Sequence, residues 1–197
     1  MYTDYNTHSN DRVWFAMSAP FGRELEAKRL LDKRKIENFI PMHYDVVVKR
    51  TGEKKRELVP AIRNFIFVRT TRPVIQETKR EIRILQYYTR PENGKNIPVI
   101  IPETQMSRFV AVSETHDEKL VYMKPEEVDL RKGRRVRIHG GAFDGVEGVF
   151  VKVRGIRNRR VVVLVEGIAA VVMAEIKPDL IEALPQEENG KTLKLCL

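Results

Sequence analysis

Apolar residues recur along the first part of the chain with two spacings, one of period two and one of period 3.6. Runs of β-branched or aromatic residues predict strands, whereas apolar residues at i, i+3 and i+4 on a charged segment predict amphipathic helices. The predicted strands are residues 13–19, 37–50, 58–70 and 83–90, and the predicted helices are residues 22–36, 72–82 and 101–114. Packing the helices on one face of a sheet is the economical arrangement, which predicts an α+β, ferredoxin-like sandwich.

The pattern changes about two thirds of the way along the chain. Residues 123–131 are polar and contain Pro125, which predicts a linker, and residues 132–184 then hold four short Val- and Ile-rich segments separated by turns. Short strands at close, even spacing are typical of a small β-barrel, here of the SH3-like type. Within it, Gly148 falls inside a strand pattern and predicts a bulge or a close approach of two backbones. The remaining segments, residues 1–12 and 185–197, are predicted to be tails.

The charge of this second region bears on its partner. The chain carries a formal net charge of +9, and residues 131–160 alone hold ten Lys or Arg against two acidic residues. Clustered cations neutralise phosphates and release counterions, so this excess predicts a nucleic acid or another acidic partner. Four arginines flank one predicted hairpin turn, where guanidinium groups suit phosphate, although a solvated hairpin explains the same pattern. They are Arg154, Arg157, Arg159 and Arg160.

Residues that could carry catalysis or bind a metal are scarce. The chain has one cysteine, Cys196, which excludes an internal disulfide framework and a cysteine-based zinc cluster. Its four histidines are scattered, the motifs G-x-S-x-G and H-E-x-x-H do not occur, and the glycine-rich HGGAFDG lacks the lysine of a phosphate-binding loop. We therefore expect no enzyme activity, no cofactor and no metal. The polar N-terminus and the lack of a long apolar run predict a cytoplasmic protein without a membrane segment.

Both halves of the chain resemble the NusG family of transcription elongation factors, over residues 13–184. Trp14 and Phe15 open the first strand as the aromatic pair of the family does, and Glu24 stands where its first helix carries an acidic residue. Residues 59–68, VPAIRNFIFV, resemble the proline–aromatic–turn–aromatic strand of the family. In the second half, the KOW motif is matched by Gly133, Val136, Ile138, Gly141, Phe143, Gly145 and Gly148.

The resemblance implies an NGN domain at residues 13–122, a linker at 123–131 and a KOW domain at 132–184. Such an NGN domain docks on the clamp helices of the largest RNA polymerase subunit through an apolar patch and suppresses pausing. Ile62 and Phe65 are expected on the surface, because the turn beside them looks exposed, whereas burial in the core is the alternative for each aromatic. The residues in question, called the docking patch below, are Trp14, Phe15, Phe39, Ile62, Phe65 and Phe67.

The resemblance also implies contacts with upstream or non-template DNA, and nascent RNA is a further candidate partner. The residues that would border the nucleic-acid cleft are charged and belong to predicted helices or loops, so solvation of a surface charge is the alternative for each. They are Arg23, Lys79, Arg80 and Arg83.

Departures within these motifs resemble the specialised UpxY and RfaH paralogues. Arg63 and Asn64 replace the usual Pro-Gly, and Ile62 replaces one aromatic. This branch implies a monomeric antiterminator of capsular polysaccharide operons. The turn at residues 166–168 lacks the aromatic through which the general factor engages a ribosomal protein or Rho, which argues against coupling to either. The alternative function is a KOW-containing RNA-binding protein associated with ribosomes, which explains the basic barrel but not the first half.

Overall fold

The computed structural model describes residues 10–123, 133–153, 157–165, 168–173 and 176–185. Its strands form two larger sheets and two separate hairpins, and three α-helices accompany them. The predicted class, a mixture of helices and strands, is confirmed as α+β by the observed elements. No helix among the described residues is long and apolar enough to cross a membrane.

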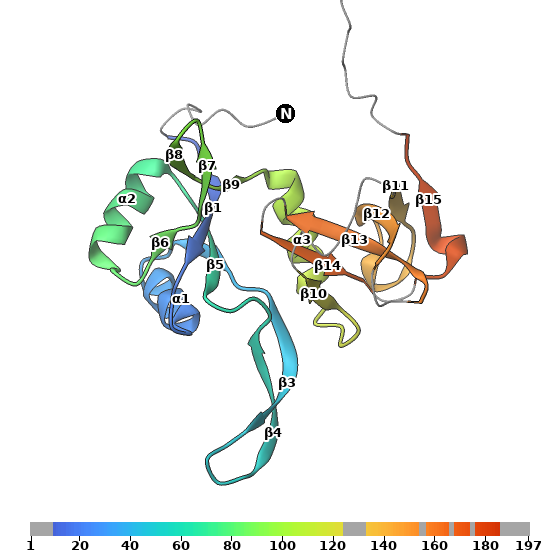
Figure 1. Cartoon of the computed structure of the whole chain (residues 1–197), viewed down its shortest axis with the longest axis horizontal. Helices are drawn as coiled ribbons and strands as arrows, with labels where there is room; N and C mark the ends of the chain where they lie inside the picture. Colours follow the sequence, from blue (N-terminus) through green and yellow to red (C-terminus); the bar gives the residue numbers. More distant parts are fainter. Residues whose placement is uncertain (1–9, 124–132, 154–156, 166–167, 174–175, 186–197) are drawn as a thin grey trace, which may run out of the picture.

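The first sheet is built around β1 and β5, which pair antiparallel along their whole length. Its strand order is β2-β5-β1-β6, with β9 also paired to β1 (Figure 1). The strands are β1 (Val13–Ser18), β2 (Glu37–Phe39), β5 (Phe65–Thr70), β6 (Gln86–Tyr87) and β9 (Ile100–Ile101). Both β1 and β5 are almost wholly buried, so each must be covered on its two faces.

The helices cover both faces of the first sheet, which corrects the predicted arrangement on one face. Alternate side chains of a strand point to opposite faces, and those of β1 divide accordingly between two core clusters. Phe15 and Met17 pack with residues of α1 and α2, whereas Trp14 and Ala16 belong to the cluster that contains Phe109 of α3. The helices are α1 (Glu24–Lys33), α2 (Arg72–Glu81) and α3 (Glu103–Ser113).

Two hairpins stand apart from the sheets. The longer one joins β3 (Met42–Val48) to β4 (Lys54–Pro60) and extends away from the body of the molecule (Figure 1). The shorter one joins β7 (Thr89–Glu92) to β8 (Lys95–Pro98). Its two turn residues, Asn93 and Gly94, both adopt positive φ, which is the Asn-Gly turn that matches the twist of a two-residue hairpin.

The second sheet has six antiparallel strands in the order β10-β14-β13-β12-β11-β15. The four predicted strands of the second region are confirmed as β11 to β14, and β10 and β15 extend the sheet at its two ends. Its strands are β10 (Val121–Met123), β11 (Arg134–Ile138), β12 (Glu147–Lys152), β13 (Arg159–Val165), β14 (Ala169–Val172) and β15 (Ile181–Ala183), with 3₁₀ turns η3 (Gly141–Phe143) and η4 (Pro178–Leu180).

Strand β10 changes the expected boundary between the halves. The sequence assigns Val121 and Tyr122 to the first region and Met123 to a linker, but all three pair antiparallel with β14. The chain therefore enters the second sheet directly after α3. The rest of the expected linker, residues 124–131, lies outside the described residues.

Gly148 lies where β12 passes close to β13, as its place in the strand pattern predicts. A Cβ atom on Gly148 would lie 2.7 Å from the carbonyl oxygen of Val162 and 2.7 Å from Cγ1 of Val161. Real Cβ atoms do not approach a backbone oxygen so closely, so only glycine lets the two strands pack at this spacing.

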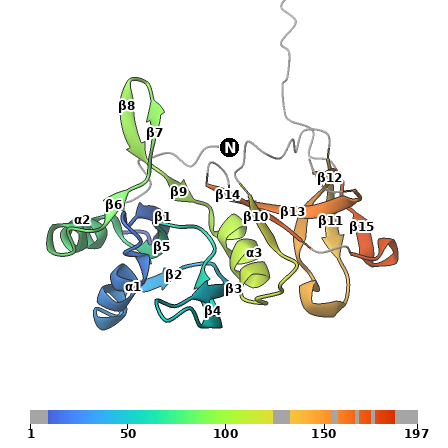
Figure 2. The same cartoon turned by 60° about the horizontal axis from the view of Figure 1, so that its bottom comes forward.

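Helix α3 lies between the two sheets (Figure 2). One continuous apolar cluster contains Trp14 and Phe67 of the first sheet, Phe109 of α3, and Val161 and Val163 of β13. A helix that is buried on two sides must be apolar on both, and α3 meets this condition with buried or half-buried side chains around most of its circumference. The two halves of the chain thus share one core.

Candidate functional site

The docking patch is divided between the two faces of the first sheet. Trp14, Phe65 and Phe67 are buried in the cluster shared with α3 and the second sheet, and Phe39 and Ile62 are half-buried against the same cluster. Phe15 points to the opposite face, where it packs under α1 and α2, because neighbouring residues of a strand alternate. The structure therefore brings five of the six residues together and separates Phe15 from them.

The expected exposure of Phe65 is wrong in this conformation. Its side chain is only 6% exposed, and its ring lies 5.0 Å from that of Phe67 and 5.4 Å from that of Tyr88. Tyr88 is itself exposed, so the aromatic cluster reaches the surface beside Phe65. Ile62 is half-buried at the edge of the same cluster, which makes it the accessible residue of the pair.

Phe109 of α3 is the centre of the aromatic contacts on this face. Its ring lies 5.5 Å from Phe67, 6.2 Å from Phe39 and 6.4 Å from Tyr122, each with steeply inclined planes. Edge-to-face pairs of this kind stabilise beyond the area that they bury, by about 0.5–1.5 kcal/mol each. Because Tyr122 belongs to β10, these rings join the first sheet to the second through α3.

The turn before β5 is exposed, as predicted. Asn64 has a φ of 61°, in the left-handed region that glycine usually occupies, and its carboxamide oxygen accepts a hydrogen bond from the N–H of Gly22 at 2.8 Å. The carbonyl of Asn64 accepts a second bond from the N–H of Ala19 at 2.9 Å. Asn64 thereby holds two loops together at one end of the first sheet.

Phe21 is a surface residue that the sequence analysis missed. It lies beside this turn, 92% exposed and with a φ of 62°, in the loop that leads into α1. A non-glycine aromatic in this backbone region is uncommon. The signal available in the sequence is a bulky apolar residue between Pro20 and Gly22, where turn residues are usually polar.

A group of charges links α3 to the second sheet. Glu147 on β12 forms ion pairs with Arg108 of α3 and with Arg135 and Arg137 of β11, at 3.7 Å and 2.6 Å for the last two. The hydrogen bond from Arg137, helped by the charges of all three arginines, holds the pKa of Glu147 below its ordinary value. Its carboxylate is therefore ionised at neutral pH and oriented by both halves of the chain.

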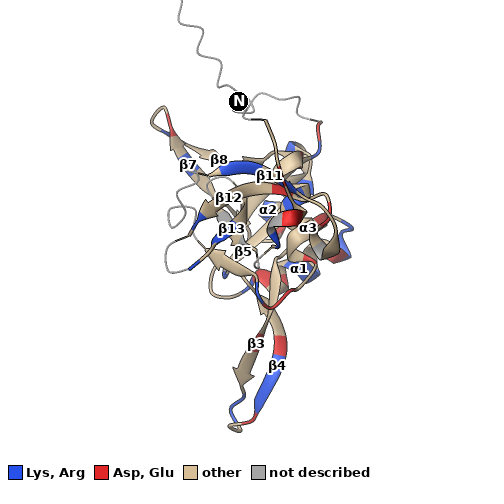
Figure 3. Ribbon diagram, turned by 90° about the vertical axis from the view of Figure 1, so that its right-hand side faces the viewer, with Lys and Arg blue, Asp and Glu red and all other residues tan. Residues whose placement is uncertain are grey.

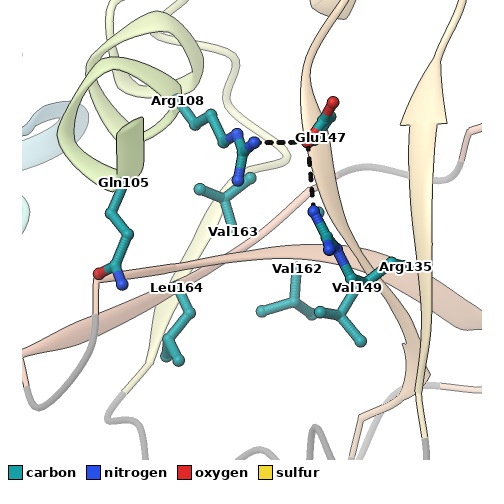
Figure 4. Close-up of a pocket in the computed structure, with 9 residues that line it drawn as sticks. Gln105, Arg108, Arg135, Glu147, Val149, Val162, Val163 and Leu164 are labelled. Atoms are coloured by element: carbon teal, nitrogen blue, oxygen red, sulfur yellow. Dashed lines mark hydrogen bonds and ion pairs between the residues drawn. The ribbon is translucent and has the colours of Figure 1, made fainter. Parts of the chain in front are cut away.

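A cavity of about 190 Å³ lies where α3 faces this side of the second sheet (Figure 4). Gln105 and Arg108 of α3 lie on one side of it, and Glu147, Val149 and Leu164 line the other. The cavity holds one acid already paired with arginines, and no nucleophile with an adjacent base. In the described part of the chain, no three His, Cys, Asp or Glu side chains are grouped to hold a metal ion.

The cations expected beside the nucleic-acid cleft differ in availability. Arg23 donates from Nε to Glu26 at 2.7 Å, a bond that lowers the pKa of that carboxyl group. Lys79 is half-buried with its ammonium group 3.9 Å from the centre of the Tyr87 ring, and burial lowers its pKa. Arg80 and Arg83 are exposed at the end of α2 and just beyond it. The last two are the better placed for phosphate.

The arginines of the second sheet surround the turn between β12 and β13. Arg157 and Arg159 are exposed and Arg160 is half-buried, while Arg154 lies outside the described residues. The Lys152 ammonium group donates to the carbonyl of Arg157 at 2.6 Å, which ties the turn to the end of β12. The expected cationic hairpin is thus present on the surface, and its ligand stays a prediction.

Comparison with family models gives a match over the first half of the chain. The family model described as "Transcription termination factor nusG" matches residues 12–110. The structure described as "Domain interaction in Thermotoga maritima NusG" aligns with 89% of this chain and 98% of its own, at 17% identity and a TM-score of 0.42. A comparison with curated protein sequences gives no match.

Proposed function

Because the chain belongs to the NusG family, whose members act in transcription elongation and termination and bind RNA polymerase, we propose that it docks on the clamp helices of the largest polymerase subunit. The proposal assigns the first sheet with α1 to α3 to an NGN domain and the second sheet to an SH3-like KOW domain. Bound there, the protein suppresses pausing or termination. It does so by binding the active form of the polymerase more tightly than the paused form, which shifts the population towards elongation.

The observation that carries the proposal is the apolar face shared by Ile62, Phe65, Phe67 and α3. It lies within the region that the family model matches, and its rings are closely packed against one another, as aromatic side chains are in the centre of a strong interface. In this conformation the second sheet covers α3 on the side away from the first sheet. Docking through this face therefore requires the second sheet to move off α3, which breaks the ion pair between Arg108 and Glu147.

We further assign the protein to the antiterminator branch, acting in capsular polysaccharide operons. The support is local: Asn64 takes the left-handed conformation that the glycine of the usual Pro-Gly would take, and Ile62 stands in the place of an aromatic. The side chains that this turn exposes then differ from those of the general factor, whereas the backbone conformation of the turn stays the same. The ribosome-associated alternative is not favoured, because it leaves residues 12–110 without a role.

Capture of RNA polymerase by the purified chain tests the docking proposal. We expect Ile62→Glu to reduce capture at least about tenfold, since a charge would be placed on the accessible part of the proposed apolar contact. Leu25→Glu is the matched control: Leu25 is exposed on α1, on the other side of the sheet. Equal capture by both variants would contradict the assignment of this face. Transcription on a paused template, with and without the protein, then tests the effect on pausing.

A further inference from the structure

The hairpin of β3 and β4 projects from the body of the molecule, and none of its strand residues is fully buried. Each strand has seven residues, which at about 3.3 Å per residue gives a ribbon about 23 Å long. Its register runs without interruption from Met42 opposite Pro60 to Val48 opposite Lys54. Beyond it, the N–H of Lys49 donates to the carbonyl of Glu53 at 2.9 Å, so the ladder continues into the turn. The ribbon is thus a regular, projecting element.

The two faces of the ribbon differ in chemistry. Residues paired across an antiparallel ladder lie on the same face, and successive residues alternate. One face, called the apolar–basic face, carries no acidic residue, and the opposite face carries Asp45 and Glu57. The apolar–basic face consists of Tyr44, Val46, Val48, Lys54, Arg56 and Leu58.

Two valines at the outer end of this face are more than half exposed. Val46 is 57% exposed and Val48 is 60% exposed. Nearer the body, the guanidinium of Arg56 lies 4.4 Å from the centre of the Tyr44 ring and forms an ion pair with Glu118, which follows α3. The base of the ribbon is therefore held to the segment that follows α3, whereas its outer half is accessible to a partner.

The outer half is also strongly cationic. Residues 49–55 hold four Lys or Arg and one Glu, a net charge of +3. Figure 3 shows these cations along the outer part of β4 and at the turn. No carboxylate of the described chain is paired with Lys49, Arg50 or Lys54. An exposed apolar strip beside unpaired cations is suited to a ligand that has an apolar surface between two rows of negative charges.

We propose that this ribbon enters the major groove of duplex DNA. That groove is about 12 Å wide and admits a two-stranded β-ribbon, whereas the major groove of an RNA duplex is too narrow and a single strand is bound by stacked aromatics. Lys49, Arg50 and Lys54 contact phosphates on the two sides of the groove. Val46 and Val48 lie against its floor, where the methyl groups of thymine are the apolar contacts on offer.

The inference deepens the proposed function, since a transcribing complex supplies the duplex, but its test needs no polymerase. Binding of the full chain to a labelled DNA duplex is measured by fluorescence anisotropy over a range of salt concentrations. We expect Arg50→Glu with Lys54→Glu to weaken binding about tenfold or more and to lower the salt slope by about two, because two phosphate contacts are lost. The matched control is Arg29→Glu with Lys33→Glu, the same change of charge on exposed positions of α1.

A second variant separates groove insertion from charge attraction. Val46→Ser with Val48→Ser should weaken duplex binding severalfold at an unchanged salt slope. The proposal is overturned if the ribbon and control charge variants bind the duplex equally well, or if an RNA duplex binds as tightly as DNA. It is also overturned if ribbon variants keep the duplex but lose polymerase, which would assign the ribbon to a protein surface. The polymerase capture measured for Ile62→Glu does not enter this test, because the DNA-binding measurement contains no polymerase.

Discussion

Arg108 on α3 and Glu147 on β12 form an ion pair between segments that are 39 residues apart, and this pair joins the two halves of the molecule. Glu147 is the better buried of the two and is held on its other side by Arg137 of the neighbouring strand. A carboxylate shared by three arginines cannot be removed without leaving them to repel one another. A substitution in this ion pair should therefore weaken the contact between α3 and the second sheet while leaving the packing within each half intact.

Substitution of this pair should open the molecule without unfolding either half. We expect Arg108→Ala to lower the free energy of unfolding by about 1 kcal/mol, which is typical of a hydrogen bond between charged groups that are partly exposed. We also expect the variant to capture more RNA polymerase than the wild type. Capture by purified variants measures the effect. Arg108→Lys is the matched control: it keeps a positive charge beside Glu147 and should leave capture close to that of the wild type. Capture that is unchanged in Arg108→Ala would show that the second sheet does not obstruct docking.

The contribution of Glu147 to stability should depend on pH. Its pKa in the folded chain lies below the ordinary value of 4.5, because the hydrogen bond from Arg137 and the nearby arginine charges favour the ionised form. A depressed pKa stabilises the fold above the unfolded value, and the gain is lost as pH falls through the folded value. The melting temperatures of the wild type and Glu147→Gln should thus differ most at neutral pH, and the difference should shrink as the pH falls below 4.5. A difference that grows as the pH falls would contradict this sign.

Gly148 should not tolerate a side chain. Gly148→Ala places a methyl group 2.7 Å from the carbonyl oxygen of Val162. Because this oxygen belongs to the backbone of a paired strand, it cannot shift easily, and we expect the free energy of unfolding to fall by about 1–3 kcal/mol. Chemical denaturation measures it. Gly52→Asn serves as the control, because Gly52 is in open space and asparagine tolerates its positive φ. Similar stability of the two variants would refute the close approach of β12 and β13.

Asn64 has two separable roles. Asn64→Gly keeps the left-handed backbone and loses only the bond from Gly22, so a loss of about 1 kcal/mol is expected. Asn64→Ala loses the bond and strains the backbone as well, adding about 1 kcal/mol. Thermal unfolding of both variants gives the comparison. Should alanine be tolerated as well as glycine, the positive φ would not be a requirement of this turn.

Much of the secondary structure follows from short-range pattern. The run of aromatic and β-branched residues from Phe65 to Val68 predicts a strand, and the spacing of Ala27 and Leu31 predicts the buried side of α1. Partners distant in sequence escape such patterns. Nothing near Glu147 in the chain indicates Arg108, and the ribbon of β3 and β4 reads as an ordinary hairpin until its two faces are placed in register.

The sequence by itself determined where the three helices and the longer strands lie, that the second region is cationic, and which side chains of a strand share a face. Those properties are encoded by neighbours a few residues apart. Only the tertiary structure decided what covers each face: α3 lies over Phe67, and the second sheet lies over α3. Whether a side chain is exposed depends on which other segment packs against it. The burial of Phe65 and the exposure of Val46 therefore follow only from the packing of segments that are distant in the sequence.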